Sequence, residues 1–154
     1  MKIKLEIDEQ LLEDEVIIRC RQVSPAIHQV HQSIMDVSSP TKLIFYKKNE
    51  ESSEEYYIPL KDLLFFETSA ENVYAHTTSD VFRSKLRLYE LEKILPVNFV
   101  RVSKSAILNT AQVLSINRNL HSASLVHFHK SHKQVYVSRF YYKQLREKMY
   151  NGSG

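Results

Sequence analysis

The stretch with the clearest chemical character in this sequence runs from Phe99 to Asn109. It begins like a strand, with Phe99 and Val102 as apolar members and Arg101 between them, and it returns to apolar residues at 107–108. Between these parts lies Ser103-Lys104-Ser105, two hydroxyls around one ammonium. Such groups suit a contact with phosphate and make a poor core. On these residues alone a solvated loop between two strands is the simpler interpretation, so the rest of the chain must decide.

Charge is divided unequally along the chain. Residues 1–80 hold 8 Lys and Arg against 15 Asp and Glu, whereas residues 81–154 hold 13 against 3. Between 96 and 150 the sequence has nine basic residues and a single acid, Glu147. A basic half of this kind is typical of a protein that binds a polyanion, since each neutralised phosphate releases counterions. A basic face that serves protein contacts is the alternative.

Other chemistries find less support. His127, His129 and His132 have a spacing that could hold zinc, but no cysteine or carboxylate lies nearby in sequence and the neighbourhood is basic. We therefore expect no metal and no cofactor. The chain lacks a glycine-rich phosphate loop and a carboxylate pair in an apolar frame, and Cys20 has no base beside it. We expect that the protein is not an enzyme.

RNA is a more serious alternative to duplex DNA, because small basic sheets with aromatic residues can stack single-stranded bases. The aromatic candidates are Tyr136, Phe140 and Tyr141. These positions also suit a core, and we assign most of them to it.

Composition indicates the kind of fold that positions these residues. The chain has 154 residues, 43% of them hydrophobic, with 9 Tyr, 7 Phe and only 2 Gly, which favours strands without low-complexity linkers. No stretch approaches the roughly 20 apolar residues of a membrane span, and residues 1–8 have no apolar signal core. Together with a single cysteine, this predicts a cytoplasmic protein.

Residues 1–40 are predicted to form a small strand–strand–helix appendage. Lys2–Asp8 alternates strictly between polar and apolar residues, and Val16–Val23 is interpreted as a second strand. Ser24-Pro25 supplies a helix start, followed by apolar residues at spacings of three and four until residues 38–40 end the helix. We expect this appendage to serve dimerisation or regulation, with a purely structural role equally possible.

From residue 41 the pattern predicts short antiparallel strands with two helices. The acidic connector 49–55 joins a hairpin, Ser84 is placed to cap a helix that Pro96 ends, and Ser138 is placed to cap a last helix. The tail, residues 151–154, is expected to be flexible. The predicted strands are Leu43–Lys48, Tyr56–Leu60, Leu63–Thr68, Val73–Thr78, Val81–Ser84, Phe99 onward, Val113–Ile116, Leu125–His129 and Val135–Val137.

Four segments in order resemble the LytTR family of bacterial DNA-binding domains over roughly residues 42–149. They are LLFFETS from residue 63, LYELEKILP from residue 88, FVRVSKSAILN from residue 99 and VYVSRFYYKQL from residue 135. The resemblance implies a mainly β, elongated stack of small antiparallel sheets with short helices. It also implies a transcriptional regulator that binds promoter direct repeats, with two protomers that reach successive major grooves through loops rather than a recognition helix.

The resemblance also indicates which loops contact DNA. The loop before Val73 contributes Glu71 or Asn72, and we prefer Asn72 because an amide can read a base edge, whereas phosphate repels a carboxylate. The segment Ser103–Ser105 matches the family's central contact loop, and Arg139 matches the arginine at the start of the terminal helix. The full set of expected DNA-binding residues is Asn72, Arg101, Ser103, Lys104, Ser105, Lys133, Ser138, Arg139 and Lys143.

The sequence departs from the family pattern in two places. The family often has His where this chain has Ser103, and Arg or Asn where it has Lys104, so the base preference does not transfer. The family's response regulators carry a phosphoacceptor receiver domain, for which forty residues are too few, so we expect no phosphorylation switch. Receiverless members are commonly linked with a membrane protein that acts as inhibitor, which the resemblance implies as a further partner.

Overall fold

The computed structural model describes residues 1–38, 40–49 and 53–151, and it divides the chain into two units, Met1–Ile34 and Met35–Gly154. In the described part, ten strands and three α-helices follow one another with two short 3₁₀ turns, η1 and η2. The elements are α1 Pro25–Ser38, β1 Lys42–Lys47, β2 Tyr56–Pro59, η1 Leu60–Asp62, β3 Phe65–Ser69, β4 Asn72–His76, β5 Val81–Ser84, α2 Leu88–Ile94, β6 Phe99–Ser103, β7 Ala106–Asn109, η2 Thr110–Gln112, β8 Val113–Asn117, β9 Ser124–Phe128, β10 Gln134–Val137 and α3 Arg139–Asn151.

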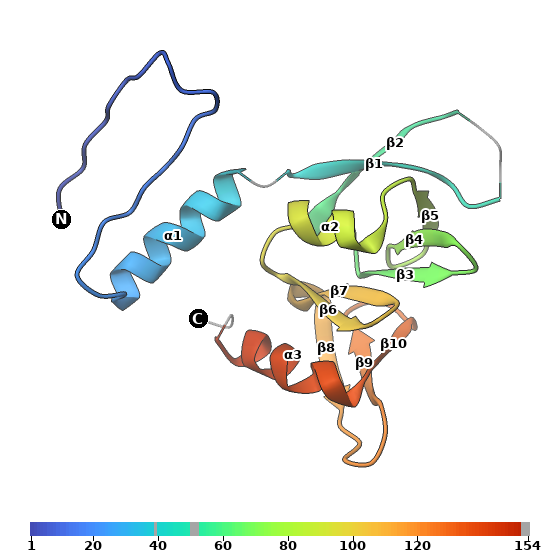
Figure 1. The fold of residues 1–154 in the computed structure, drawn as a ribbon. Helices are drawn as coiled ribbons and strands as arrows, with labels where there is room; N and C mark the ends of the chain where they lie inside the picture. The colour runs from blue at the N-terminus through green and yellow to red at the C-terminus, as the bar shows by residue number, and fades with distance from the viewer. Residues whose placement is uncertain (39, 50–52, 152–154) are drawn as a thin grey trace. The chain divides into compact units, whose positions relative to one another are not determined.

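The first unit contains the start of α1 and no strand (Figure 1). The predicted helix is confirmed, and Ser24 caps it: its Oγ accepts from the Ile27 amide at 3.2 Å. The two predicted strands, Lys2–Asp8 and Val16–Val23, are wrong for this structure, which gives residues 1–24 neither helix nor strand. An alternating strand needs a surface on which to bury its apolar face, and none of the side chains of residues 1–34 is buried.

The second unit is built on a seven-stranded sheet in the order β2-β1-β5-β4-β3-β7-β6 and a three-stranded sheet in the order β10-β9-β8. Every strand pair recorded in the two sheets is antiparallel. The short polar turns between alternating apolar segments explain this arrangement, since hairpins need only a few turn residues. The predicted fold class, mainly β with small antiparallel sheets and short helices, is therefore confirmed.

The central strands of the large sheet are covered on both faces, because neighbouring residues along them point to opposite sides. Phe65 pairs with Leu108 and belongs to a core shared with the small sheet and with Leu145 of α3. Phe66 pairs with Ile107 and belongs to a second core, shared with α2. In Figure 1, α2 accordingly lies on one side of β6 and β7, and β8–β10 with α3 lie on the other. Strands β6 and β7 are thus held from both sides.

Helix starts differ from the prediction in detail. The Oγ of Ser84 accepts from the Leu86 amide at 3.0 Å in a local turn, and α2 begins only at Leu88, where Glu90 accepts from the Arg87 amide at 3.0 Å. Of the predicted connector 49–55, residues 50–52 lie outside the described residues, as do Ser39 and residues 152–154 of the predicted tail.

Candidate nucleic-acid interface

The turn between β3 and β4 presents Asn72. Ser69 pairs with Asn72, so only two residues, Ala70 and Glu71, reverse the chain. Their φ angles are 53° and 146°, in the region that favours glycine. Asn72 is exposed at this tip, and the Glu71 carbonyl accepts from Arg87 Nη1 at 3.4 Å. The turn therefore holds the Asn72 amide at the end of a paired strand.

The turn between β6 and β7 presents Lys104 and Ser105, both exposed. Arg101 braces it from within the molecule: Nε donates to the Ser103 carbonyl at 2.6 Å, Nη2 donates to the Lys104 carbonyl, and Nη1 pairs with Glu92. All three parts of the guanidinium fork are thus engaged inside the protein. Arg101, which the sequence suggested as a phosphate contact, holds the turn through bonds within the protein.

The start of α3 presents Arg139. Ser138 occupies the position before the helix, and its carbonyl accepts from the amides of Tyr141 and Tyr142. Its hydroxyl, however, is buried without a hydrogen-bond partner among the described residues, so the predicted side-chain cap is absent. Arg139 is exposed at the first turn, where unpaired backbone N–H groups favour an anion.

Two hydrogen bonds place these three elements side by side. The Thr68 amide donates to the Ser105 carbonyl at 2.8 Å, and the Ser138 amide donates to the Val102 carbonyl at 2.9 Å. The row is therefore β4, β3, β7, β6 and the start of α3. With strands about 4.8 Å apart, Asn72 lies about 10 Å from Ser105, within the roughly 12 Å width of a major groove. The whole row extends about 20 Å.

Lys133 is not part of this row. It precedes β10, whereas Arg139 follows it, and its Nζ donates to the Asp80 carbonyl at 2.6 Å, in the turn beyond the His76 end of β4. Ser131 Oγ donates to the Thr78 carbonyl in the same turn at 3.1 Å. Burial lowers the pKa of the Lys133 ammonium, although the Asp80 and Glu67 carboxylates oppose this. Lys133 therefore ties two turns together at the other end of β4.

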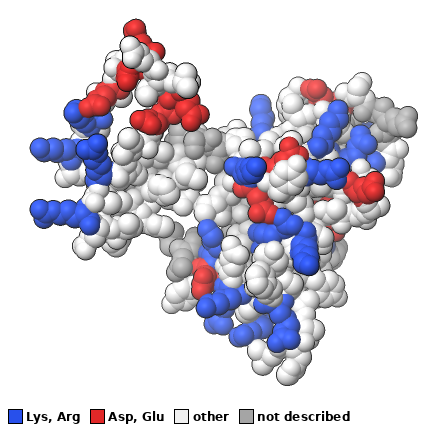
Figure 2. Space-filling model, in the orientation of Figure 1, with Lys and Arg blue, Asp and Glu red and all other residues white. Residues whose placement is uncertain are grey.

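Lys143 continues the surface along α3. It lies one turn after Arg139, and Arg146 follows one turn later, so these three exposed side chains share a helix face. Leu145 and the half-buried Tyr141 occupy the opposite face and anchor the helix. Figure 2 shows Lys and Arg atoms gathered over this part of the molecule.

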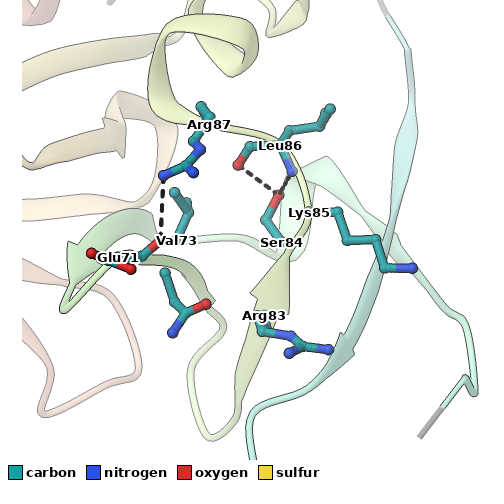
Figure 3. A pocket seen from close by; sticks show the side chains of 8 residues that line it. Glu71, Val73, Arg83, Ser84, Lys85, Leu86 and Arg87 are labelled. Carbon is teal, nitrogen blue, oxygen red and sulfur yellow. Dashed lines mark hydrogen bonds between the residues drawn. The ribbon is translucent and has the colours of Figure 1, made fainter. Parts of the chain in front are cut away.

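A second group of basic residues, which the sequence analysis did not select, lies beside Asn72. A hollow of about 240 Å³ is lined by the end of the β3–β4 turn and by Arg83, Lys85 and Arg87 (Figure 3). Arg87 points toward the Glu71 carbonyl, and Lys85 Nζ lies 4.2 Å from the ring centroid of Tyr46. Alternate basic residues along 83–87 were the available sequence signal, but the sequence analysis considered only the basic residues from 96 onward.

The aromatic residues differ from their prediction. Phe140, next to Arg139, is 85% exposed, and Tyr136 is 66% exposed, so the prediction that most of the three aromatic residues belong to the core is wrong. Tyr141 is half-buried against the core, as assigned. On α3, Phe140 points about 100° away from its neighbour and off the buried face. On β10, Tyr136 points to the side opposite the buried Val135 and Val137.

Within residues 1–38, 40–49 and 53–151, no three His, Cys, Asp or Glu side chains gather closely enough to hold a metal ion. A search of the same residues finds no helix with the length and apolar character that crossing a membrane requires.

The described site is thus part of a mainly β unit that presents two strand turns, a helix start and a basic helix face. The sequence profile of the LytTr DNA-binding domain matches residues 53–150 of this chain. The chain therefore belongs to the LytTR family, whose members are DNA-binding domains of transcriptional regulators and not enzymes.

Relatives and a solved structure agree with this assignment. Proteins of Staphylococcus aureus strains MSSA476 and MW2, each described as an HTH-type transcriptional regulator, are 29% identical over 149 residues, 97% of this chain and 98% of theirs. The LytTr DNA-binding domain of a putative methyl-accepting/DNA response regulator from Bacillus cereus has the same fold, with a TM-score of 0.62, 21% identity, and coverage of 71% of this chain and 96% of that one. In the described part of this chain, strands separate each helix from the next, which is not a helix-turn-helix arrangement.

Proposed function

We propose that this protein is a bacterial transcriptional regulator that binds duplex promoter DNA through the two strand turns and the start of α3. The observation that carries the proposal is the hydrogen-bonded row that brings Asn72, Lys104 and Arg139 to one end of the sheets. The names of the S. aureus relatives as transcriptional regulators support it.

In the proposed complex Asn72, Lys104 and Arg139 each contact a different part of the DNA. Arg139 can donate two hydrogen bonds to O6 and N7 of one guanine, and the Asn72 amide can pair with N6 and N7 of adenine. Lys104 donates to a guanine edge or to phosphate, and the hydroxyls of Ser103 and Ser105 suit phosphate oxygens. Arg101 acts through the turn that it braces and does not reach the DNA.

Phosphate contacts flank this row on both sides. Lys143 and Arg146 extend it along α3, and Arg87 with Lys85 extends it beyond Asn72. Because the row of turns is wider than one groove, these cations fall where the phosphate backbones border it. They supply affinity that does not depend on sequence.

We further propose that two protomers occupy direct repeats about one helical turn apart, as the family resemblance implies. The resemblance also suggests a membrane-protein inhibitor among its partners, and the composition suggests a cytoplasmic location.

Selection from a random duplex library, followed by mobility-shift competition, tests the proposal. We expect an enriched site with two copies of one motif, which binds more tightly than the same duplex with one copy replaced. Single-stranded RNA of the same sequence should compete poorly. Equal competition by that RNA would favour base stacking on the exposed Phe140 and Tyr136 instead, and no enrichment with no salt dependence would favour a protein-binding face.

A further inference from the structure

The first unit has apolar surface without a core. None of the side chains of residues 1–34, all of which the structure describes, is buried. Ile3, Leu5 and Ile7 are 96%, 87% and 86% exposed. Isolated exposed apolar residues are ordinary, but a whole unit without a buried side chain lacks the main driving force for folding. Its apolar side chains therefore lack the contacts within the unit that would bury them.

Residues 2–8 are self-complementary when two copies are paired antiparallel about Leu5. In that register Lys2 lies opposite Asp8, Lys4 opposite Glu6, and Ile3 opposite Ile7. Each cation meets a carboxylate and each apolar residue meets another. Two-fold symmetry makes each of these three pairs occur twice, with Leu5 opposite Leu5 at the centre. Lys4 Nζ lies 2.7 Å from Glu6 Oε1, so the polar residues already share a side in the single chain.

Pairing within the chain offers one register with opposite charges, in which Glu6 meets Arg21 and Asp8 meets Arg19, but it sets Leu5 opposite Gln22 and so pairs apolar residues less well. Other intrachain registers are worse. If residues 2–8 paired with 16–23 so that Glu6 met Arg19, Lys4 would lie opposite Arg21. If Ile7 met Val16, Lys4 and Lys2 would both lie opposite arginines. Shifting either register by one residue sets apolar residues of 2–8 opposite those arginines. Like charges directly opposite destabilise a strand pair, and the structure gives residues 1–24 no strand in any register.

We propose that residues 2–8 pair antiparallel with the same residues of a second copy, centred on Leu5, and make residues 1–34 a dimerisation unit. The resulting two-stranded ribbon, residues 2–8 of both copies, gathers on one face the six apolar side chains of Ile3, Leu5 and Ile7 from the two copies. The stripe of Ile27, Val30 and Ile34 on α1, none of which is buried, supplies apolar surface to cover it. Dimerisation through residues 2–8 would give the pairing of two protomers on DNA a physical basis, and it does not depend on DNA binding.

Cysteine cross-linking of the full-length protein, in a Cys20→Ser background, tests the register. Residues directly opposite have Cα atoms about 4.5–5.5 Å apart, within disulfide range, so Leu5→Cys should form disulfide-linked dimers under mild oxidation. Ile3→Cys alone should not, because its two copies lie about 13 Å apart along the ribbon. A mixture of Ile3→Cys and Ile7→Cys proteins should cross-link. Cross-linking of Ile3→Cys alone as readily as Leu5→Cys overturns the register.

Charge reversal tests the energetics in sedimentation experiments without DNA. Lys4→Glu places two carboxylate pairs in the ribbon and should weaken dimerisation roughly tenfold or more. The double variant Lys4→Glu/Glu6→Lys should restore it, and Lys61→Glu, the same change at an exposed residue of η1, should leave it unaltered. A wild-type protein that stays monomeric at tens of micromolar, or a double variant as weak as Lys4→Glu, overturns the proposal.

Binding to a duplex with a single copy of the selected motif separates this proposal from the proposed function. Lys4→Glu should bind that single copy as the wild type does, whatever its oligomeric state. If Lys4→Glu loses dimerisation but still binds the single copy, the loss concerns the proposed strand pairing alone. If the wild type dimerises but shows no sequence preference for duplex DNA, the proposed function is wrong and the strand pairing stands.

Discussion

At the scale of single residues, the basic side chains of the second unit serve two different purposes. Arg101 and Lys133 donate to backbone carbonyls and hold turns in place, whereas Lys104, Arg139 and Lys143 are exposed. Sequence analysis placed all five in one set, because a basic residue type does not reveal whether its partner will be a carbonyl of the same chain or a phosphate.

Replacement of Arg139 by Ala should lower the affinity for the selected site by about 1–3 kcal/mol and reduce discrimination among site variants, because a bidentate base contact is lost. Titrations of wild type and variant against a panel of single-base site variants measure both effects. Lys61→Ala is the matched control, because Lys61 is exposed beyond the opposite end of β3. If Arg139→Ala preserves the ranking of the panel, Arg139 does not read a base.

Replacement of Arg101 by Ala should also weaken specific binding, but through the β6–β7 turn, whose Ser103 and Lys104 carbonyls would lose their donors. The slope of log affinity against log salt should stay as in the wild type, because no phosphate contact is removed. Arg101→Lys should not rescue binding, since one ammonium cannot replace the fork. A salt slope reduced by about one would instead identify a direct phosphate contact.

His76 gives the second unit a predicted pH dependence. Its ring is buried, stacks on Phe65 with centroids 4.2 Å apart, and lies 2.7 Å from Glu67 through Nε2. Burial lowers the pKa of His76 below 6.5 despite the Glu67 carboxylate that raises it, and Lys133 and Lys48 lower it further. The ring is therefore neutral at pH 7, and the pair is a hydrogen bond.

Because the unfolded chain binds a proton at His76 near pH 6.5 and the folded chain resists it, the free energy of unfolding should fall as the pH drops below 6.5. The loss can reach about 1.4 kcal/mol per pH unit. Urea unfolding of wild type and His76→Gln between pH 7.5 and 5.5 measures it, and the variant should show a shallower slope. Equal slopes would mean that other groups cause the dependence.

At the scale of elements, sequence reasoning succeeded where alternation is short and is bounded by polar turns. The strands from residue 42 onward and the helices at their ends were located to within a few residues, because local turn chemistry and the buried faces agree there. The strands assigned to residues 1–24 failed for the opposite reason: alternation shows what a strand would bury, but not whether a partner exists in the same chain.

The candidate site was predictable only in part. The family resemblance selected the turns that present Asn72 and Lys104, and the start of α3. It did not reveal the basic residues of 83–87, which come near Asn72 only because β4 pairs with β5. Sequence separation also hid the place of Lys133, since the two ends of β10 belong to different surfaces.

Asn109 links the elements below the row of turns. It is fully buried; its Nδ2 donates to the Leu63 carbonyl at 3.0 Å, and its Oδ1 accepts from the Ala111 amide at 3.0 Å and from Asn98 at 2.7 Å. Asn109→Ala should lower the free energy of unfolding by about 2–4 kcal/mol, because buried backbone groups lose their partners. Denaturant unfolding measures it. Asn98→Ala, which removes one of these bonds, should cost less, and equal costs would contradict this account.

At the scale of the whole molecule, charge is divided between an acidic N-terminal half and a basic C-terminal half. For a DNA-binding chain this predicts strong salt dependence, since each phosphate contact releases counterions. Lys143→Ala should weaken binding to all duplexes nearly equally and reduce the salt slope by about one. Titrations at several salt concentrations, on selected and scrambled duplexes, measure both. A loss confined to the selected site would assign Lys143 to base reading.

The β3–β4 turn reverses direction through Ala70 and Glu71, two non-glycine residues whose φ angles lie in the positive region that favours glycine. The only glycines of the chain are at 152 and 154. Few other conformations are open to such a turn once its flanking strands are paired. In the proposed complex, Asn72 would therefore lose little freedom on meeting a base, and the entropic cost of ordering this contact is met during folding rather than during recognition.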